Sequence, residues 1–121
     1  MTALLMLAAL ISGGEAAEDA YARAYWDCRN HGKPLVVLIG QPTGCAPCAR
    51  MHREMASADL KGVAFCELDA AEHAAKRLMQ GTVIPQLYLR WQRDGQWYGR
   101  TVVGYQTPAQ VAELIREAKA K

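Results

Sequence analysis

The chain has 121 residues, the size of one domain with a single hydrophobic core. Apolar residues make up 51% of it and charged residues 21%, as in ordinary globular proteins. The net charge of +2 is spread without a basic stripe, which argues against a nucleic-acid partner. The four cysteines are too few for a fold held together mainly by disulfides.

The N-terminal segment differs from the rest of the chain. Residues 3–11 (ALLMLAALI) form an uncharged apolar run that is too short to span a bilayer. Gly14 and Ala16 place small side chains at the −3 and −1 positions of a cleavage site, as in a secretory signal peptide. No Lys or Arg precedes the run, so a helix packed on the domain and a truncated longer signal stay open as alternatives. We expect residues 1–16 to be a signal peptide or an N-terminal apolar segment and residues 17–121 to be the domain. The expected location is periplasmic or otherwise extracytoplasmic, and a cytoplasmic location is the alternative.

The first predicted elements of the domain are an amphipathic helix and a buried strand. The apolar face of the helix has the spacing i, i+3, i+4 and i+7: Tyr21, Ala24, Tyr25 and Cys28. Gly32 and Pro34 end this helix. The apolar run Leu35–Ile39 (LVVLI) is typical of a strand that is buried on both faces of a parallel sheet.

A second helix, a second strand and a third helix follow. After a loop over residues 40–44, Cys45 begins a helix that is expected to run to about Met55. Residues 62–69 (GVAFCELD) predict another buried strand, and residues 70–80 fit a helix.

The last part of the chain predicts a hairpin and a closing helix. Residues 87–91 alternate between apolar and polar side chains, as in a half-buried strand. Residues 94–95 (DG) are a two-residue hairpin signal, and residues 97–103 are the partner strand. Thr107 and Gln110 form a capping box at the start of the last helix. The order αβαβαββα predicts a layered α/β sandwich.

The motif Cys45-Ala46-Pro47-Cys48 is the chief candidate for chemistry. A cysteine at a helix N-terminus faces unpaired N–H groups and the positive end of the helix dipole, which favour thiolate over thiol. Cys48 lies one turn further along, where the field is weaker and burial opposes ionisation. We therefore expect Cys45 to be the attacking nucleophile and Cys48 the resolving thiol. A static bridge is the alternative, although this spacing at a helix start gives reducible disulfides.

These features together resemble the thioredoxin superfamily. The likeness covers about residues 21–118 and rests on the strand 35–39, the CxxC motif and the segment 82–85 (TVIP) before the hairpin. It implies a thioredoxin-like three-layer α/β/α sandwich with a mixed central sheet. It also implies a cis-proline at Pro85 beside the dithiol, with the backbone of Ile84 pairing with the bound substrate. The leading helix and its "GKP" junction are most similar to thioredoxin-like domains of exported bacterial proteins.

The sequence departs from thioredoxins proper in three respects. The tryptophan that precedes the first cysteine in thioredoxins is Gly44 here. The strand 35–39 lacks the buried aspartate that relays protons in thioredoxins, and the lysine partner of that aspartate appears as Phe65. Without a buried base, Cys48 must lose its proton to water or to a more distant group, for which Glu67 is a weak candidate.

The remaining candidate residues have simpler interpretations. Cys28 and Cys66 are expected to be inert core thiols, and a bridge between them requires Cα atoms within about 7 Å. His52 follows Cys48 by one helical turn and could join Cys45 and Cys48 in binding a soft metal such as copper or zinc. A surface histidine is the simpler interpretation.

We therefore predict a thiol–disulfide oxidoreductase that exchanges disulfides with protein or small-thiol substrates. The catalytic residues are Cys45 and Cys48, and the substrate-binding residues are Ile84 and Pro85; no metal or other cofactor is expected. The central Ala-Pro dipeptide is closer to that of reducing relatives, which favours a reductase. We expect a monomer whose dithiol is recycled by a redox partner. The alternative is a non-catalytic module that binds a soft metal or a partner peptide.

Overall fold

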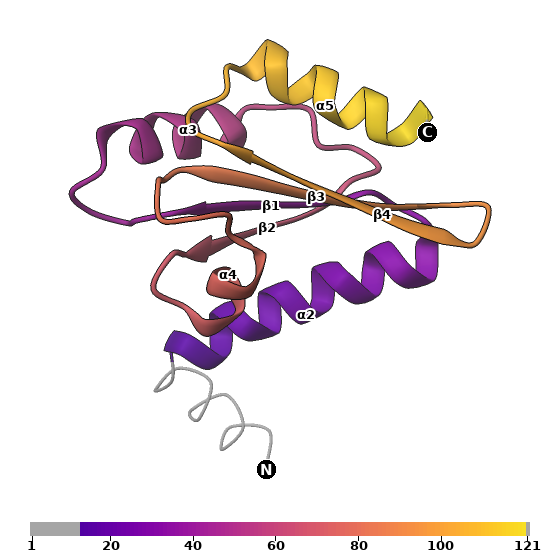
Figure 1. Cartoon of the computed structure of the whole chain (residues 1–121), viewed down its shortest axis with the longest axis horizontal. Coiled ribbons are helices and arrows are strands. Elements are labelled where there is room, and N and C mark those ends of the chain that lie inside the picture. Colours follow the sequence, from indigo (N-terminus) through magenta and orange to yellow (C-terminus); the bar gives the residue numbers. More distant parts are fainter. Residues whose placement is uncertain (1–12, 121) are drawn as a thin grey trace.

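The computed structural model describes residues 13–120, which form a sheet covered on both faces by helices (Figure 1). Residues 1–12, most of the predicted leader, lie outside the described residues, so the boundary at Ala16 stays a prediction, as does the location. Within residues 13–120, no helix is long and apolar enough to cross a membrane. In chain order the elements are α2 (Gly13–His31), β1 (Leu35–Gly40), α3 (Ala46–Ala56), β2 (Ala64–Asp69), α4 (His73–Leu78), β3 (Gln86–Arg93), β4 (Gln96–Val103) and α5 (Pro108–Ala120).

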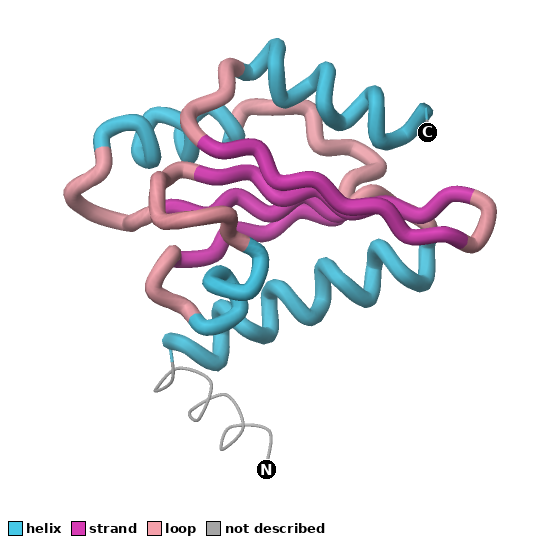
Figure 2. Tube along the Cα trace, viewed as in Figure 1, coloured by secondary structure: helices cyan, strands magenta, loops and turns pink. Residues whose placement is uncertain are grey.

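The sheet has four strands in the order β2-β1-β3-β4. Strand β1 is parallel to β2 and antiparallel to β3, and β4 is antiparallel to β3. Val37 in β1 lies between Cys66 of β2 and Tyr88 of β3. Figure 2 shows the β3–β4 hairpin extending beyond the parallel strands. The predicted mixed sheet and the order αβαβαββα are confirmed.

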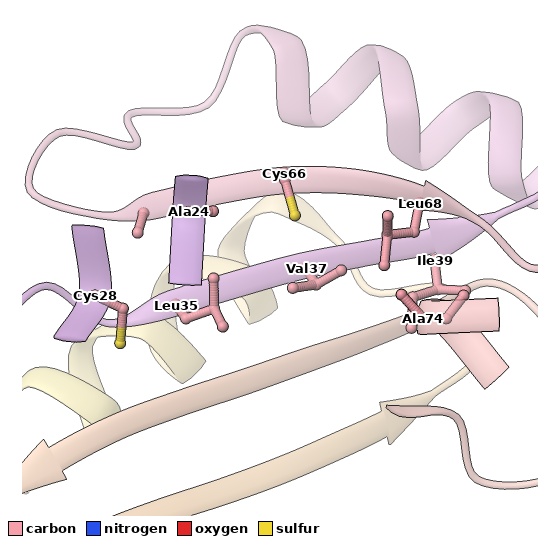
Figure 3. Packing of buried hydrophobic residues seen from close by; sticks show 10 residues of the cluster. Ala24, Cys28, Leu35, Val37, Ile39, Cys66, Leu68 and Ala74 are labelled. Carbon is pink, nitrogen blue, oxygen red and sulfur yellow. The ribbon is translucent and has the colours of Figure 1, made fainter. Parts of the chain in front are cut away.

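Each face of the sheet carries its own apolar core, which makes the molecule a three-layer α/β/α sandwich. Helices α2 and α4 cover one face, where Cys28, Val37 and Cys66 belong to one buried cluster (Figure 3). Helices α3 and α5 cover the other face, where Met51 and Leu87 belong to a second cluster. Strand β1 contributes alternate residues to both clusters, so its continuously apolar sequence follows from burial on both faces.

Two predicted elements differ from the structure. Strand β2 lies at the edge of the sheet, and the buried strand predicted over residues 62–69 begins at Ala64 and is buried mainly on one face. Its side chains alternate, with Cys66 buried and Glu67 exposed. The helix predicted over 70–80 is shorter in the structure. The Ala70 N–H donates to the Gly40 carbonyl at 2.8 Å, so Ala70 still pairs with β1 and does not begin a helix. The Asp69 carboxylate then accepts from the next N–H at 2.9 Å in a turn that delays the helix to His73.

Local signals set two other boundaries as predicted. Asp94 and Gly95 have φ values of 52° and 80°, the left-handed pair that a two-residue hairpin turn requires. At the start of α5, the Thr107 N–H donates to Gln110 Oε1 at 2.8 Å, and the Gln110 N–H donates to Thr107 Oγ1 at 3.1 Å. This reciprocal pair is the predicted capping box.

Candidate dithiol site

Cys45 and Cys48 are joined by a disulfide at the N-terminus of α3, with their Cα atoms 5.2 Å apart. Cys45 is the N-cap residue in an extended conformation, and its Sγ accepts the N–H of Cys48 at 3.2 Å. Pro47 occupies the first turn, where its missing N–H leaves no helical hydrogen bond unmade. The first turn contains no acidic side chain that would oppose the positive end of the helix dipole. The predicted helix start at the CxxC motif is confirmed.

The two cysteines differ in their access to solvent. Cys45 is half-buried beside an exposed loop, whereas only 4% of Cys48 is exposed. A thiolate at the position of Cys45 would benefit from the helix N-terminus and from solvent. Burial at the position of Cys48 favours the neutral thiol. The geometry therefore has the asymmetry that an attacking and a resolving thiol need.

The end of β1 approaches Cys48 closely because residue 40 is glycine. A Cβ added at Gly40 would lie 3.2 Å from both Cβ and Sγ of Cys48. Sequence reasoning assigned Gly40 to a loop and gave it no role. The structure places it as the last residue of β1, where the missing side chain lets α3 and its disulfide pack against the sheet.

The segment before β3 lies next to the dithiol, as the resemblance implied. The Ile84–Pro85 peptide bond is cis. Pro85 and Cys48 line the same cavity, and the Pro85 carbonyl accepts the Gly104 N–H at 2.8 Å. Val83, two residues before Pro85, leaves 60% of its surface exposed. An exposed residue thus lies two positions before the proline that lines the cavity with Cys48.

Gln86 fixes this segment and was missed from the sequence. It is fully buried, and its side-chain amide donates to the carbonyls of Gln80 and Val83, both at 2.8 Å. Its Oε1 accepts the Gln80 N–H, also at 2.8 Å. Since all three bonds hold the turn before Pro85, Gln86 is the residue that shapes the candidate substrate loop. Its sequence signal is a polar residue directly after a proline, at the start of a strand with an apolar face.

His52 does not stand alone on the surface. Its Nδ1 lies 2.6 Å from Oε2 of Glu67, which joins α3 to β2 across the rim of the cavity that Cys48 lines. Within residues 13–120, no group of three or more His, Cys, Asp and Glu side chains is arranged to hold a metal ion. From the sequence, His52 is interpreted as a surface histidine and Glu67 as a weak candidate to accept the Cys48 proton. Their pairing is a finding of the structure.

A second polar cluster flanks the opposite side of α3. Tyr105 donates its hydroxyl hydrogen bond to Glu54, and Arg50 Nε lies 3.4 Å from the same carboxylate. The Arg50 guanidinium also lies over the Tyr105 ring at 4.7 Å. The hydrogen bond to Glu54 raises the pKa of Tyr105 above its ordinary value. Because Tyr105 follows Gly104, which bonds to Pro85, this cluster anchors a loop next to the dithiol.

The other two cysteines lie apart from this site. Cys28 and Cys66 are free thiols, and both are buried in the core beneath α2. Burial raises the pKa of Cys66 to about 12 and also raises the pKa of Cys28. The prediction that both lie in the core as thiols is confirmed, and their inertness stays a prediction.

Solved structures with similar architecture are thioredoxins. Chloroplastic thioredoxin z aligns with a TM-score of 0.66 and 19% identity over 83% of this chain and 90% of its own. A thioredoxin from Thermus thermophilus aligns with a TM-score of 0.61 and 18% identity, over 84% and 85% of the two chains. Trichomonas vaginalis thioredoxin aligns with a TM-score of 0.58 and 19% identity, over 84% of this chain and 89% of its own. The chain has a thioredoxin fold. No family model and no curated protein matches the sequence.

Within this thioredoxin fold, the surroundings of the dithiol differ from the pattern of thioredoxins proper. Gly44, with a φ of 76°, precedes Cys45 where thioredoxins proper carry tryptophan. Leu38, from β1, lines the cavity beside Cys48. Among the described residues, Gln86 is the one polar residue that is buried as a whole, and no Asp or Glu is buried. The charged groups nearest the dithiol therefore lie at the rim of the cavity rather than in the core.

Proposed function

We propose that this chain is a thiol–disulfide oxidoreductase that works through Cys45 and Cys48. The observation that carries the proposal is the disulfide at the N-terminus of α3, with one half-buried sulfur, one buried sulfur and Pro85 beside them. Low thiolate pKa values at helix N-termini and reversible CxxC disulfides are the properties that this chemistry needs. The thioredoxin fold of the chain supports the same conclusion.

In the reducing direction, the Cys45 thiolate attacks one sulfur of a substrate disulfide. A bond forms between Cys45 Sγ and that sulfur, and the other substrate sulfur leaves with the electron pair. The Cys48 thiolate then attacks Cys45 Sγ and releases the second substrate sulfur. Two electrons pass from the dithiol to the substrate, and the disulfide of the present structure is the product form. A redox partner must supply two electrons to reduce it again.

We propose that the substrate is a protein or small-molecule disulfide and that the loop before β3 receives it. Gln86 holds this loop by hydrogen bonds, while Val83 remains exposed. An extended substrate segment beside Ile84 would pair with its backbone as a short added strand. The Ala46-Pro47 dipeptide favours the reducing direction.

Trapping the mixed disulfide tests this proposal. The full chain is reduced, mixed with a disulfide-linked model peptide, and quenched with acid. Cys48→Ser should accumulate a covalent complex on Cys45, because the resolving sulfur is missing. Cys45→Ser should form no complex, and Cys66→Ala, a change in the core away from the dithiol, should turn over the peptide like the wild type.

The alternative function, a non-catalytic module, predicts a different result. In that case neither serine variant traps the peptide, and the wild type shows no turnover. Protein purified under reducing conditions would then contain stoichiometric copper or zinc, or would bind a peptide that lacks cysteine.

A further inference from the structure

The burial of Cys48 raises the question of how this thiol loses its proton. The resolving step requires a thiolate, yet only 4% of Cys48 is exposed and burial favours the neutral thiol. Among the described side chains no carboxylate is buried, so none lies in the core beneath the sulfur. A cavity beside α3 is lined by Cys48 and offers a path for a proton that leaves this thiol.

This cavity has a volume of about 370 Å³, which is ample for water molecules. Cys48 lines it together with charged groups from two elements. Helix α3 supplies His52 and Arg53, and strand β2 supplies Glu67 and Asp69. Water in such a polar cavity can connect the Cys48 sulfur to these side chains.

Among these four side chains, His52 is best suited to accept a proton. Arg53 is always protonated and has no acceptor. Asp69 already accepts a backbone N–H at 2.9 Å. An ionised Glu67 only accepts hydrogen bonds, so the 2.6 Å contact makes His52 Nδ1 the donor and leaves Nε2 free to take a proton. His52 also lies four residues after Cys48, on the same face of the helix.

We propose that the His52–Glu67 pair accepts the proton of Cys48 in the resolving step, through water in this cavity. The inference rests on the proposed function and assigns a second pair of residues to it. The proton moves from Cys48 Sγ through water to His52 Nε2, while Glu67 orients the imidazole and stabilises its positive charge. Cys48 Sγ then bonds to Cys45 Sγ, the bond from Cys45 to the substrate sulfur breaks, and its electron pair leaves with that sulfur.

A stopped-flow experiment with 5,5′-dithiobis(2-nitrobenzoate) separates the two chemical steps. Attack by Cys45 on this aromatic disulfide releases one coloured thiolate, and resolution by Cys48 releases the second. We compare the full-length wild type with His52→Ala and Glu67→Gln. The matched control is His73→Ala, which removes an exposed histidine at the start of α4.

The first release should be the same in all four proteins. The second release should be about tenfold slower in His52→Ala. This loss is smaller than the roughly 10²–10⁴-fold that is usual for a general base, because water can itself accept the proton. Added imidazole should restore much of this rate. Glu67→Gln should slow the second step less, because the base remains but loses its orienting partner.

Two different failures can be told apart. If the first release is missing in the wild type, the proposed function itself is wrong. If both releases occur and the second has the wild-type rate in His52→Ala and Glu67→Gln, the proton-accepting pair is wrong. The paired side chains of His52 and Glu67 are 63% and 36% exposed, so neither substitution disturbs the core.

Discussion

Replacing Gly40 with alanine tests how closely the sheet approaches the dithiol. The new Cβ would lie 3.2 Å from Cβ and Sγ of Cys48, whereas carbon atoms pack best at about 3.5–4.0 Å. Cys48 is held both by α3 and by its disulfide, so it cannot easily move away. Such overpacking costs about 1–3 kcal/mol in free energy of unfolding. Against this, alanine stabilises by about 0.4–1 kcal/mol because it restricts the unfolded chain.

Gly99→Ala is the matched control, because it restricts the unfolded chain in the same way without the close contact with Cys48. Gly99 also lies in a strand, and its added Cβ would meet its nearest neighbour, the Tyr88 hydroxyl, at an ordinary 3.6 Å. The difference between the two variants isolates the contact with Cys48 and should be about 1–3 kcal/mol. Urea unfolding of both variants, oxidised and reduced, measures this difference in free energy of unfolding. The difference should be larger in the oxidised form, because the Cys48 sulfur cannot rotate away while it is in the disulfide. Equal stability of the two variants, within about 0.5 kcal/mol, would refute the close approach.

Three further predictions concern single side chains. In the reduced folded protein at neutral pH, iodoacetamide should label Cys45 well before Cys66, because burial raises the pKa of Cys66 to about 12. Mass mapping that finds Cys66 labelled first would contradict this. The hydrogen bond to Glu54 raises the pKa of Tyr105 above its ordinary 10.0, so its hydroxyl should keep its proton to higher pH, and Glu54→Gln should lower that pKa. Ultraviolet difference titration against Tyr105→Phe measures the shift, and an unchanged curve in Glu54→Gln would be inconsistent with it. Thr107→Ala should lower the free energy of unfolding by about 0.5–2 kcal/mol through loss of the helix cap, and full stability in urea would exclude that role.

Much of the fold could be predicted because its boundaries depend on interactions between near neighbours. The capping box at Thr107 joins residues three apart, and the turn at Asp94 needs a left-handed backbone that few sequences tolerate. The helix start at Cys45 has the same local origin, since its Sγ accepts the Cys48 N–H. The resemblance to thioredoxins then placed Pro85 beside the dithiol, although 40 residues separate it from Cys45.

What could not be predicted depends on which segments meet in space. An apolar run such as that of β2 does not reveal whether a strand is central or at an edge, because the neighbouring strands decide it. His52 and Glu67 are 15 residues apart and come from different elements, so neither shows its partner in the sequence. The three hydrogen bonds of Gln86 likewise depend on how the loop before Pro85 folds back.

The central claim is that the Cys45–Cys48 disulfide is a reversible redox couple rather than a static bridge. Equilibrating the full chain with glutathione buffers, and with dithiothreitol buffers at lower potentials, and then trapping free thiols by alkylation measures this directly. We expect a two-electron transition between about −270 and −120 mV, near the lower end if the protein is a reductase. A disulfide that stays intact until below about −300 mV, as structural disulfides do, would contradict it.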